Sequence, residues 1–256
     1  MNSLDLGGRV AVVLGGSSGI GRSLALGLAE AGARVVVSAR RSEQLAQVCE
    51  EIRASGGTSR AITSDVTDRA TLEALLEQCE QELGAVDILV NAAGITVRRP
   101  TLELAEAEWQ RILDCNLTGT LRSCQIFGRR MLDRGYGRII NIASLSSFVA
   151  FHEVAAYGVS KAGVVALTQS LAVEWGPRGV CVNAIAPGVF PTELNSKLLQ
   201  GTERGHELLL RTPQARFGRT EELAGACVYL ASEAASFTNG AVLPVDGGFL
   251  ASGVNR

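Results

Sequence analysis

Metal-binding clusters and long hydrophobic runs are both missing from this 256-residue chain. Its six cysteines form no C-x-x-C pair, and none stands at zinc-like spacing from a histidine. We therefore expect reduced thiols, no metal site and a cytoplasmic location. No segment reaches the roughly 18 apolar residues that cross a bilayer. The N-terminus has no basic region before a long apolar run, so we expect no signal peptide.

An excess of positive charge is missing as well. The net charge of -2 argues against a surface for nucleic acid or for an anionic membrane. What the chain does have is an apolar fraction of 46% beside a charged fraction of 20%, which favours a globular core over disorder. Its length, with no linker, repeat or charge block, predicts one domain over residues 1–256.

Short β-branched segments alternate with longer helical patterns along the whole chain. Strands are predicted at 9–15, 33–39, 59–65, 86–94, 137–144, 180–188 and 241–248. Helices are predicted at 19–32, 42–55, 69–83, 106–115, 118–134, 155–175 and 220–231. This alternation, with continuously apolar strands, predicts an α/β fold: one doubly wound Rossmann-type domain whose seven-stranded parallel sheet has helices on both faces. Only 189–219 lacks a clear element, and we expect it to be a lid over the substrate.

A glycine-rich turn, "LGGSSGIG" at 14–21, joins the first strand to the first helix. Its spacing is G-x-x-x-G-x-G, on Gly15, Gly19 and Gly21. Glycines at such a turn let the backbone and the free N–H groups of a helix start approach a pyrophosphate. Three further residues of the turn complete this candidate cofactor site: Ser17, Ser18 and Ile20. The alternative is a tight strand–helix turn that binds nothing.

The end of the second strand bears on the type of cofactor. Dinucleotide sites that hold a free ribose 2′-hydroxyl place an acidic residue there. This chain instead has Arg40 and Arg41 after Ala39. Two guanidinium groups can clamp a 2′-phosphate, so the sequence predicts NADP(H) in preference to NAD(H). The alternative is a solvated arginine pair at a helix start.

A tyrosine and a lysine stand four residues apart in "YGVSK", as Tyr157 and Lys161. Residues at this spacing share one face of a helix. Ser144 ends the fifth predicted strand, "NAAG" at 91–94 ends the fourth, and Asn116 lies in a helix between those strands. The carboxyl ends of parallel strands line the ligand crevice of an open sheet, so these residues are expected to face one place.

Taken in order, these motifs resemble the short-chain dehydrogenase/reductase family nearly from end to end. The matching residues are the glycine turn at 15–21, Asp65, "NAAG" at 91–94, Asn116, Ser144, "YGVSK" at 157–161 and "PGVFPT" at 187–192. Leu14 departs from the pattern, because the family usually has a threonine there that ties the turn to neighbouring strands. Its loss removes no catalytic group.

The resemblance implies a role for each matching residue. Tyr157 would be the general acid in carbonyl reduction and the base in alcohol oxidation. Lys161 would bind the nicotinamide ribose and, with the oxidised nicotinamide, lower the pKa of Tyr157. Ser144 would hold the substrate oxygen, and Asn116 would anchor a proton-relaying water. The implied cofactor contacts are Asp65 and Val66 at the adenine, Asn91, Ala92, Ala93 and Gly94 on the adenosine side, and Pro187, Gly188, Val189 and Thr192 at the nicotinamide end.

Two segments, 94–100 and 147–157, are expected to border the substrate. They carry Arg98 and His152, and an arginine fork suits a carboxylate. The alternative is that Arg98 and Arg99 form surface or intersubunit ion pairs. Together with "RTPQARFGRTEEL" and "VDGGFLASGVN", these segments resemble the sugar-acid members of the family, such as gluconate 5-dehydrogenases and 2-deoxygluconate 3-dehydrogenases. The hypothesis is a small-molecule substrate, a sugar acid or polyol, interconverted with its keto form.

Two other functions stay open. A 3-oxoacyl-carrier-protein reductase shares all these motifs, and Arg129, Arg130 and Arg134 are candidates for docking its acidic carrier. A cofactor-binding regulator that has lost catalysis is the alternative from another class. Residues 162–173 are apolar around most of a helix, which predicts burial on all sides and a homotetramer. The other interpretation is packing of this helix under 189–219.

Overall fold

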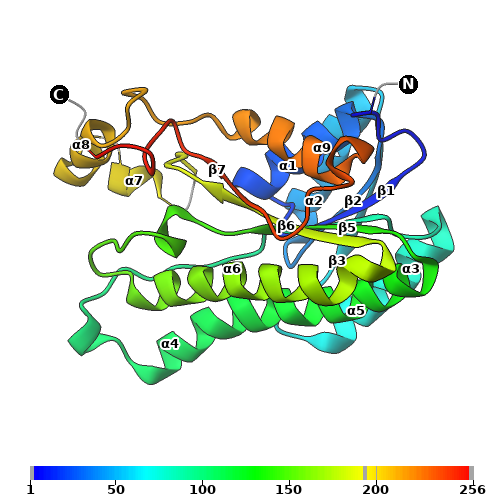
Figure 1. The fold of residues 1–256 in the computed structure, drawn as a ribbon, viewed down its shortest axis with the longest axis horizontal. Helices are drawn as coiled ribbons and strands as arrows, with labels where there is room; N and C mark the ends of the chain where they lie inside the picture. The colour runs from blue at the N-terminus through cyan, green and yellow to red at the C-terminus, as the bar shows by residue number, and fades with distance from the viewer. Residues whose placement is uncertain (1–2, 193–194, 200, 254–256) are drawn as a thin grey trace.

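The structure is a computed structural model that describes residues 3–192, 195–199 and 201–253 (Figure 1). Three residues of the expected lid, at 193, 194 and 200, lie outside the described residues, as do both chain ends. No helix within these ranges is long and apolar enough to cross a membrane.

A seven-stranded parallel sheet lies at the centre, in the order β3-β2-β1-β4-β5-β6-β7, which confirms the predicted fold class. Its strands are β1 (Val10–Leu14), β2 (Arg34–Ala39), β3 (Thr58–Thr63), β4 (Ile88–Asn91), β5 (Gly137–Ile142), β6 (Val180–Pro187) and β7 (Val242–Val245). The interior strands β1, β4, β5 and β6 are buried along their whole length. The edge strands β3 and β7 are partly exposed, because an edge strand has only one neighbour to cover it. The expectation of continuously apolar strands is wrong for β3, whose sequence is TSRAIT.

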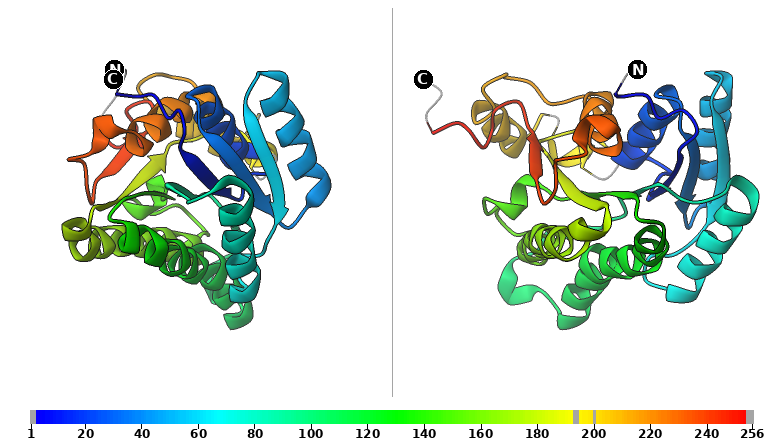
Figure 2. Two further views of the ribbon diagram at one scale, coloured as in Figure 1. Left: turned by 90° about the vertical axis from the view of Figure 1, so that its right-hand side faces the viewer. Right: turned by 45° about the vertical axis from the view of Figure 1, so that its right-hand side comes forward.

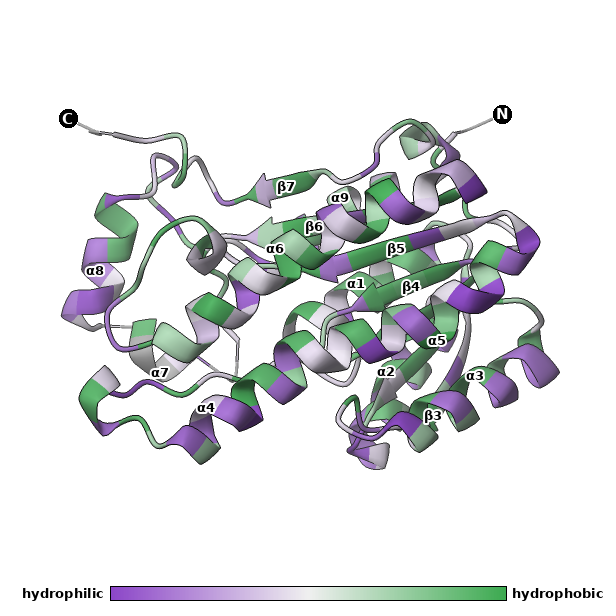
Figure 3. Cartoon of the chain, turned by 60° about the horizontal axis from the view of Figure 1, so that its bottom comes forward, coloured by the Kyte–Doolittle hydropathy of each residue, from purple (hydrophilic) through white to green (hydrophobic). Residues whose placement is uncertain are grey.

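Helices cover both faces of the sheet (Figures 1 and 2). One face carries α1 (Gly19–Glu30), α2 (Ser42–Ala54) and α9 (Ala224–Ala231). The other carries α3 (Arg69–Leu83), α5 (Gly119–Arg134) and α6 (Ala155–Trp175). β4 and β5 are mainly hydrophobic between these layers (Figure 3). Each helix buries an apolar stripe against the sheet, and the two resulting clusters form the core.

The segment 189–219 is not irregular throughout, which corrects the expectation from the sequence. It contains α7 (Ser196–Leu199) and α8 (Glu203–Leu210). The Thr202 hydroxyl accepts a hydrogen bond from the Gly205 N–H and so caps the start of α8. These helices are too short for an apolar periodicity to be visible in the sequence.

The predicted helix at 106–115 is shorter than expected and runs directly into the next one. α4 (Glu106–Leu113) is followed by a π turn at Asp114–Thr118, and α5 begins at Gly119 without a break. π turns inside α-helices are rare and concentrate at functional sites. This π turn holds Asn116, one of the predicted catalytic residues.

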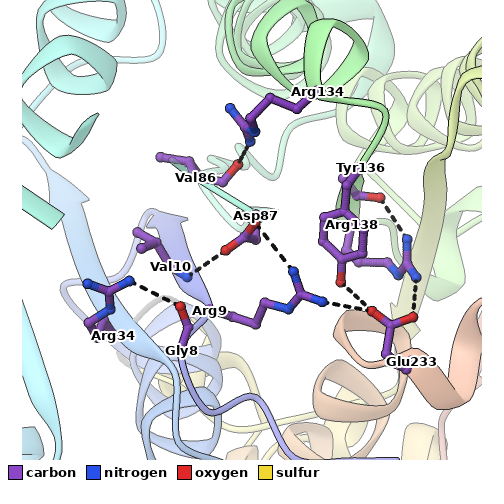
Figure 4. A network of polar contacts seen from close by, with 11 residues as sticks. Gly8, Arg9, Val10, Arg34, Val86, Asp87, Arg134, Tyr136, Arg138 and Glu233 are labelled. Carbon is purple, nitrogen blue, oxygen red and sulfur yellow. Dashed lines mark hydrogen bonds and ion pairs between the residues drawn. The ribbon is translucent and has the colours of Figure 1, made fainter. Parts of the chain in front are cut away.

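A polar network lies at the end of the sheet where the strands begin, opposite the end that forms the crevice (Figure 4). The Tyr136 ring lies between two guanidinium groups, at 4.1 Å from Arg9 and 4.6 Å from Arg138. Glu233 accepts hydrogen bonds from all three side chains. Asp87 forms an ion pair with Arg9 and accepts from the Val10 N–H. The network therefore joins β1, β4, β5 and the segment after α9.

The opposite, carboxyl-terminal edge contains the switch in strand order. β1 pairs with β2 on one side and with β4 on the other, so the chain winds away from β1 in both directions. In open parallel sheets, the ligand crevice lies at such a switch point. The glycine turn and the "NAAG" segment are the two loops at this switch point.

Candidate active site

The glycine turn packs tightly against the loop after β4. Gly15 has φ +79°, and a Cβ there would lie 2.6 Å from the backbone nitrogen of Ala93. Only glycine combines this conformation with such a close approach. A Cβ at Gly21 would in turn collide with the carbonyl of Gly15. The turn is therefore pressed onto residues 92–93, and its backbone forms one wall of the crevice.

The first turn of α1 opens into this crevice and fits an anion. Gly19, Ile20, Gly21 and Arg22 carry no acidic side chain, and the N–H groups of a helix start attract negative charge. A Cβ at Gly19 would lie 3.3 Å from the Cγ2 atom of Thr192. The start of α1 therefore faces the "PGVFPT" segment after β6, and the predicted pyrophosphate and nicotinamide contacts lie on adjoining walls.

The two arginines after β2 lie beside the turn and near Asp65. Arg41 donates from Nη2 to the Ser18 hydroxyl at 3.4 Å. Burial alone would raise the pKa of Asp65, but hydrogen bonds from Thr67 and the charges of Arg40 and Arg122 outweigh it, so this pKa lies below its ordinary value. Both arginines are exposed, so a phosphate can reach them from the crevice. The arrangement fits a dinucleotide with a 2′-phosphate.

The side chain of Asn91 lies in the core and not in the crevice. Its amide donates to the Asn141 Oδ1 atom at 2.8 Å, and its carbonyl oxygen accepts from the Ser123 hydroxyl at 2.6 Å. Asn141 in turn donates to Thr168 on α6 at 2.9 Å. These four side chains are buried. Asn91 thus ties β4 to β5, α5 and α6, whereas Gly94 of the same motif borders Asn116 and Lys161.

Asn116 is held in the π turn by four contacts. Its Oδ1 atom accepts from the Ile95 N–H at 2.8 Å, and its Nδ2 atom donates to the Ile95 carbonyl at 2.9 Å. The same Nδ2 atom donates to the Ser160 hydroxyl at 3.0 Å, and the Asn116 carbonyl accepts from Thr120. Asn116 is fully buried. Sequence reasoning missed Ser160, although it stands in "YGVSK" directly before Lys161.

Tyr157 and Ser144 meet where β5 ends and α6 begins. Burial raises the pKa of the Tyr157 phenol above its ordinary value, and a side-chain hydrogen bond with Ser144 lowers it only in part. The expected lowering of this pKa by Lys161 together with the oxidised nicotinamide concerns the complex with cofactor and stays a prediction. The phenol is protonated at neutral pH and can donate its proton.

Lys161 lies beneath the tyrosine with a buried ammonium group. Its Nζ atom is 5.8 Å from the centre of the Tyr157 ring and donates to the Ile142 carbonyl at 2.6 Å. Burial lowers the pKa of Lys161 to about 8. Asn116 from the π turn, Ser144 from the loop after β5, and Tyr157 and Lys161 from α6 thus lie close together.

The predicted substrate residues meet at the rim. Arg98 forms an ion pair with Glu153 at 2.6 Å, and His152 lies 3.6 Å from the same carboxylate. The His152 side chain is 80% exposed, so it lies at the mouth of the site and not inside it. Arg99 forms an ion pair with Glu108 on α4, which matches the surface-pair alternative for that arginine.

An apolar cluster attaches the lid to the catalytic loop. Leu199 of α7 and Leu208 of α8 pack with Leu145, which follows Ser144, and with Phe249 near the C-terminus. The ring of Phe151, before Tyr157, packs against the ring of Phe249 in a tilted arrangement, with 6.0 Å between the ring centres. α7 and α8 therefore pack against the residue that follows Ser144, on the side of the molecule where α6 begins (Figure 1). Among the described residues, no group of three or more His, Cys, Asp or Glu side chains is placed to hold a metal ion.

Comparisons with known proteins agree with this geometry. A family model described as enoyl-(acyl carrier protein) reductase matches residues 15–250. The chain is 42% identical to the D-threitol dehydrogenase of Mycolicibacterium smegmatis over 95% of this chain and 94% of that protein. It is 40% identical to the gluconate 5-dehydrogenase of Gluconobacter oxydans over 97% of each. It is 37% identical to the 5-keto-D-gluconate 5-reductase of Escherichia coli K12 over 98% of this chain and 99% of that protein.

Solved structures share the fold closely. The gluconate 5-dehydrogenase of Burkholderia cenocepacia, solved in complex with NADP and tartrate, has a TM-score of 0.95 at 38% identity, over 98% of this chain and 99% of that one. A short-chain dehydrogenase/reductase of Mycobacterium marinum has a TM-score of 0.92 at 41% identity, over 98% and 99%. These likenesses extend over almost the whole chain and agree with the converging tyrosine, lysine, serine and asparagine. The protein belongs to the short-chain dehydrogenase/reductase family and is an oxidoreductase that uses a nicotinamide cofactor.

Proposed function

We propose that this enzyme interconverts a secondary alcohol and a ketone on a sugar acid or related polyol, with NADP(H) as the hydride carrier. The observation that carries the proposal is the convergence of Ser144, Tyr157, Lys161 and Asn116 beside the glycine turn. This arrangement places a proton donor next to an anion-binding helix start. A regulator without catalysis would not need the donor.

The chain's own residues supply binding and proton transfer. The nicotinamide supplies or accepts the hydride. In reduction, the Tyr157 phenol donates its proton to the carbonyl oxygen while Ser144 holds that oxygen. The phenol is suited to this step because burial keeps it protonated at neutral pH. Lys161 carries a proton below pH 8 and has a fixed contact to Ile142, so its charge is held beneath the phenol throughout the reaction.

NADP(H) is favoured over NAD(H) by charge at the end of β2. Arg40 and Arg41 stand where a carboxylate would bind a free 2′-hydroxyl, and Arg41 already contacts the turn through Ser18. A guanidinium pair binds a phosphate through charge-assisted hydrogen bonds. The Burkholderia cenocepacia relative, which binds NADP, supports this choice.

A sugar acid is favoured over other carbonyl compounds by the names of the relatives and by the basic rim. Relatives that act on gluconate or keto-gluconate match nearly the whole chain. Arg98 lies at the mouth of the site with one carboxylate partner, Glu153. The Mycolicibacterium relative is named for D-threitol, a neutral polyol. A neutral polyol is therefore the second candidate substrate.

The geometry gives little support to the alternative function of a 3-oxoacyl-carrier-protein reductase. Arg129, Arg130 and Arg134 lie on the half of α5 that points away from Asn116, about 20 Å or more along the helix. Arg130 and Arg134 both form ion pairs with Glu80 on α3.

A homotetramer and a cytoplasmic location complete the proposal. Val159, Ala162, Ala166 and Val173 are exposed on the outer face of α6, so the segment 189–219 does not cover this apolar surface. A second copy of the chain would bury it. All six cysteines are free, as suits a reducing compartment. Sedimentation equilibrium at micromolar concentration tests the assembly, and a monomer would contradict it.

The function is tested by NADPH oxidation with 5-keto-D-gluconate, related keto sugar acids, neutral ketoses and an acetoacetyl thioester, with NADH in parallel. We expect turnover of a keto sugar acid, faster with NADPH. Turnover of the thioester alone would instead identify a carrier-protein reductase. Cofactor binding without turnover of any carbonyl compound would identify a non-catalytic binder.

A further inference from the structure

We propose that Arg204 of the lid and Arg98 together form a clamp for the substrate carboxylate, and that Glu153 occupies this clamp when substrate is absent. The proposal rests on the proposed function, because it concerns how the same site selects an acid. It gives α8 a role in substrate recognition, although none of the family motifs named above lies in α8.

Three segments distant in the sequence meet at this point. The Arg98 Nε atom lies 2.6 Å from the Glu153 Oε2 atom. Arg204, at the start of α8, donates from Nη1 to the His152 carbonyl at 3.4 Å. Burial lowers the pKa of Arg204, and so does the positive charge of Arg98, whereas Glu153 and Glu207 raise it. The two guanidinium groups therefore lie close enough to repel each other across one carboxylate.

Arg98 and Arg204 share one carboxylate. Glu153 forms the ion pair with Arg98 and raises the pKa of Arg204 more than Glu207 does. Glu207 lies on the same helix as Arg204. The His152 side chain is mostly in solvent. Two arginines that share one carboxylate can each form a bidentate contact only when a second carboxylate is present.

Glu153 is held in a strained backbone conformation. Its φ is +66°, in the left-handed region that non-glycine residues seldom adopt. Its carbonyl accepts from the Arg99 N–H at 2.8 Å, which joins the loop after β4 to the loop before α6. Strain of this kind persists where surrounding contacts impose it and is common at ligand sites. The Glu153 side chain is 22% exposed, so an entering anion can reach it.

The clamp lies on the substrate side of the proton donor. Glu153 comes four residues before Tyr157, and Arg98 comes four residues after Gly94, which borders Asn116 and Lys161. α8 is attached to the residue after Ser144 through its Leu208 side chain. A substrate whose carbonyl lies at Tyr157 would therefore extend its carboxylate along the lid towards Arg98 and Arg204.

The test compares two ketones that differ only at the acidic end. These are 5-keto-D-gluconate and L-sorbose, which has a hydroxymethyl group in place of the carboxylate. For Arg204→Gln we expect KM for the keto acid to rise about tenfold or more, the loss typical of a charge-assisted hydrogen bond. The kcat for the keto acid and the kcat/KM for L-sorbose should stay within about twofold. Arg204→Lys should restore part of the affinity, because it keeps the charge but not the fork.

Arg178→Gln is the matched control, since Arg178 forms an exposed ion pair with Asp133 at the far end of α6. It makes the same change in net charge and should leave both substrates unaffected. For Glu153→Gln we expect KM for the keto acid to fall about two- to fivefold, because a competing ion pair is removed. A rise in KM would overturn the competing role of Glu153.

Equal effects of Arg204→Gln on the acid and the neutral ketose would overturn the clamp, and so would an unchanged KM for the acid. In each variant, an unchanged Kd for NADPH shows that the fold is intact. These results differ from failure of the proposed function, which would appear as no turnover of any keto sugar acid or ketose by the wild-type enzyme. If L-sorbose alone were turned over, the enzyme would be a neutral polyol dehydrogenase without a carboxylate clamp.

Discussion

The Asn116 amide donates a hydrogen bond to the Ser160 hydroxyl at 3.0 Å, and both side chains are fully buried. Ser160 in turn donates to the Tyr157 carbonyl at 2.7 Å. The π turn and the helix that carries the proton donor are therefore joined by one hydroxyl group. Ser160 positions catalytic residues without contacting the reacting atoms.

Removal of that hydroxyl should slow catalysis without weakening binding. For Ser160→Ala we expect kcat to fall about two- to tenfold, the usual effect of losing one buried hydrogen bond, with KM and the NADPH Kd unchanged. Ser170→Ala is the control on the same helix, because Ser170 is exposed and donates only to the Ala166 carbonyl. Equal kcat values for the two variants would show that Ser160 has no positioning role.

Tyr157→Phe should abolish turnover and leave the cofactor site intact. The substitution removes the phenol that donates the proton and keeps the ring that fills the site. We expect kcat to fall by at least about 100-fold, as for loss of a general acid, while the NADPH Kd measured by fluorescence titration changes less than about twofold. A variant that keeps more than a few per cent of the wild-type rate would show that the proton comes from another group.

Arg40→Ala should weaken the binding of NADPH and leave the binding of NADH unchanged. Arg40 is exposed and its charge acts on Asp65, so it can neutralise a 2′-phosphate bound beside β2. We expect the NADPH Kd to rise about tenfold or more and the NADH Kd to stay within about twofold, because only NADPH loses a charge-assisted hydrogen bond. Arg60→Ala, which breaks an exposed pair with Glu82 on the edge strand, is the control. Equal losses for the two cofactors would mean that Arg40 does not touch the 2′-phosphate.

The close approach at Gly15 should be intolerant of any side chain. Gly15 and Gly8 have nearly the same backbone angle, φ +79° and +82°, but only Gly15 faces a backbone nitrogen 2.6 Å from the position of a Cβ. Within the described part of the chain, no heavy atom lies within 4 Å of a Cβ at Gly8. Gly8→Ala should therefore reduce the free energy of unfolding by about 1–2 kcal/mol through backbone strain alone.

Gly15→Ala should cause the same backbone strain and, in addition, a steric clash with the backbone nitrogen of Ala93. We expect a further loss of about 1–3 kcal/mol, as for overpacked sites, together with a rise in the NADPH Kd. Urea denaturation and cofactor titration of both variants measure these effects. Similar stability and similar cofactor affinity in the two variants would contradict the tight packing of the turn on residues 92–93.

The buried Lys161 should make the free energy of unfolding depend on pH in the alkaline range. Its folded pKa, about 8, lies below the ordinary value of 10.5. Below pH 8 the lysine is protonated in both states, so the desolvation of its charge opposes folding in full. Between pH 8 and 10.5 the unfolded chain binds a proton that the folded chain does not, and the free energy of unfolding therefore rises with pH.

The measurement compares the wild type with Lys161→Met, both without cofactor. From pH 7.5 to 10, we expect the free energy of unfolding of the wild type to rise by about 2 kcal/mol relative to the variant, given 1.36 kcal/mol for each unit of pKa shift. The difference between the proteins cancels the titration of the other lysines, tyrosines and cysteines. A constant difference across this range would show that Lys161 is not shifted by burial.

Most of the sheet, and the place of the motifs on it, follow from the sequence because their signals are local. Apolar runs of strand length, helical periodicity and the glycines of the first turn depend on neighbouring residues, and the alternation of strand and helix leaves few topologies. The resemblance of "YGVSK" and "NAAG" to a family then placed Tyr157, Lys161 and Gly94 at one edge. The helix α8 does not follow from the sequence, because its eight residues are too few for a clear apolar periodicity.

The amino-acid sequence thus determines the fold class, the crevice and the identity of the proton donor, because each depends on short stretches of consecutive residues. The tertiary structure alone decides which way side chains point and what surrounds them. Asn91 enters the core and not the crevice, burial keeps the Tyr157 phenol protonated, and Arg204 meets Arg98 across Glu153. These outcomes depend on desolvation and on charges that meet only when distant segments are brought together by folding.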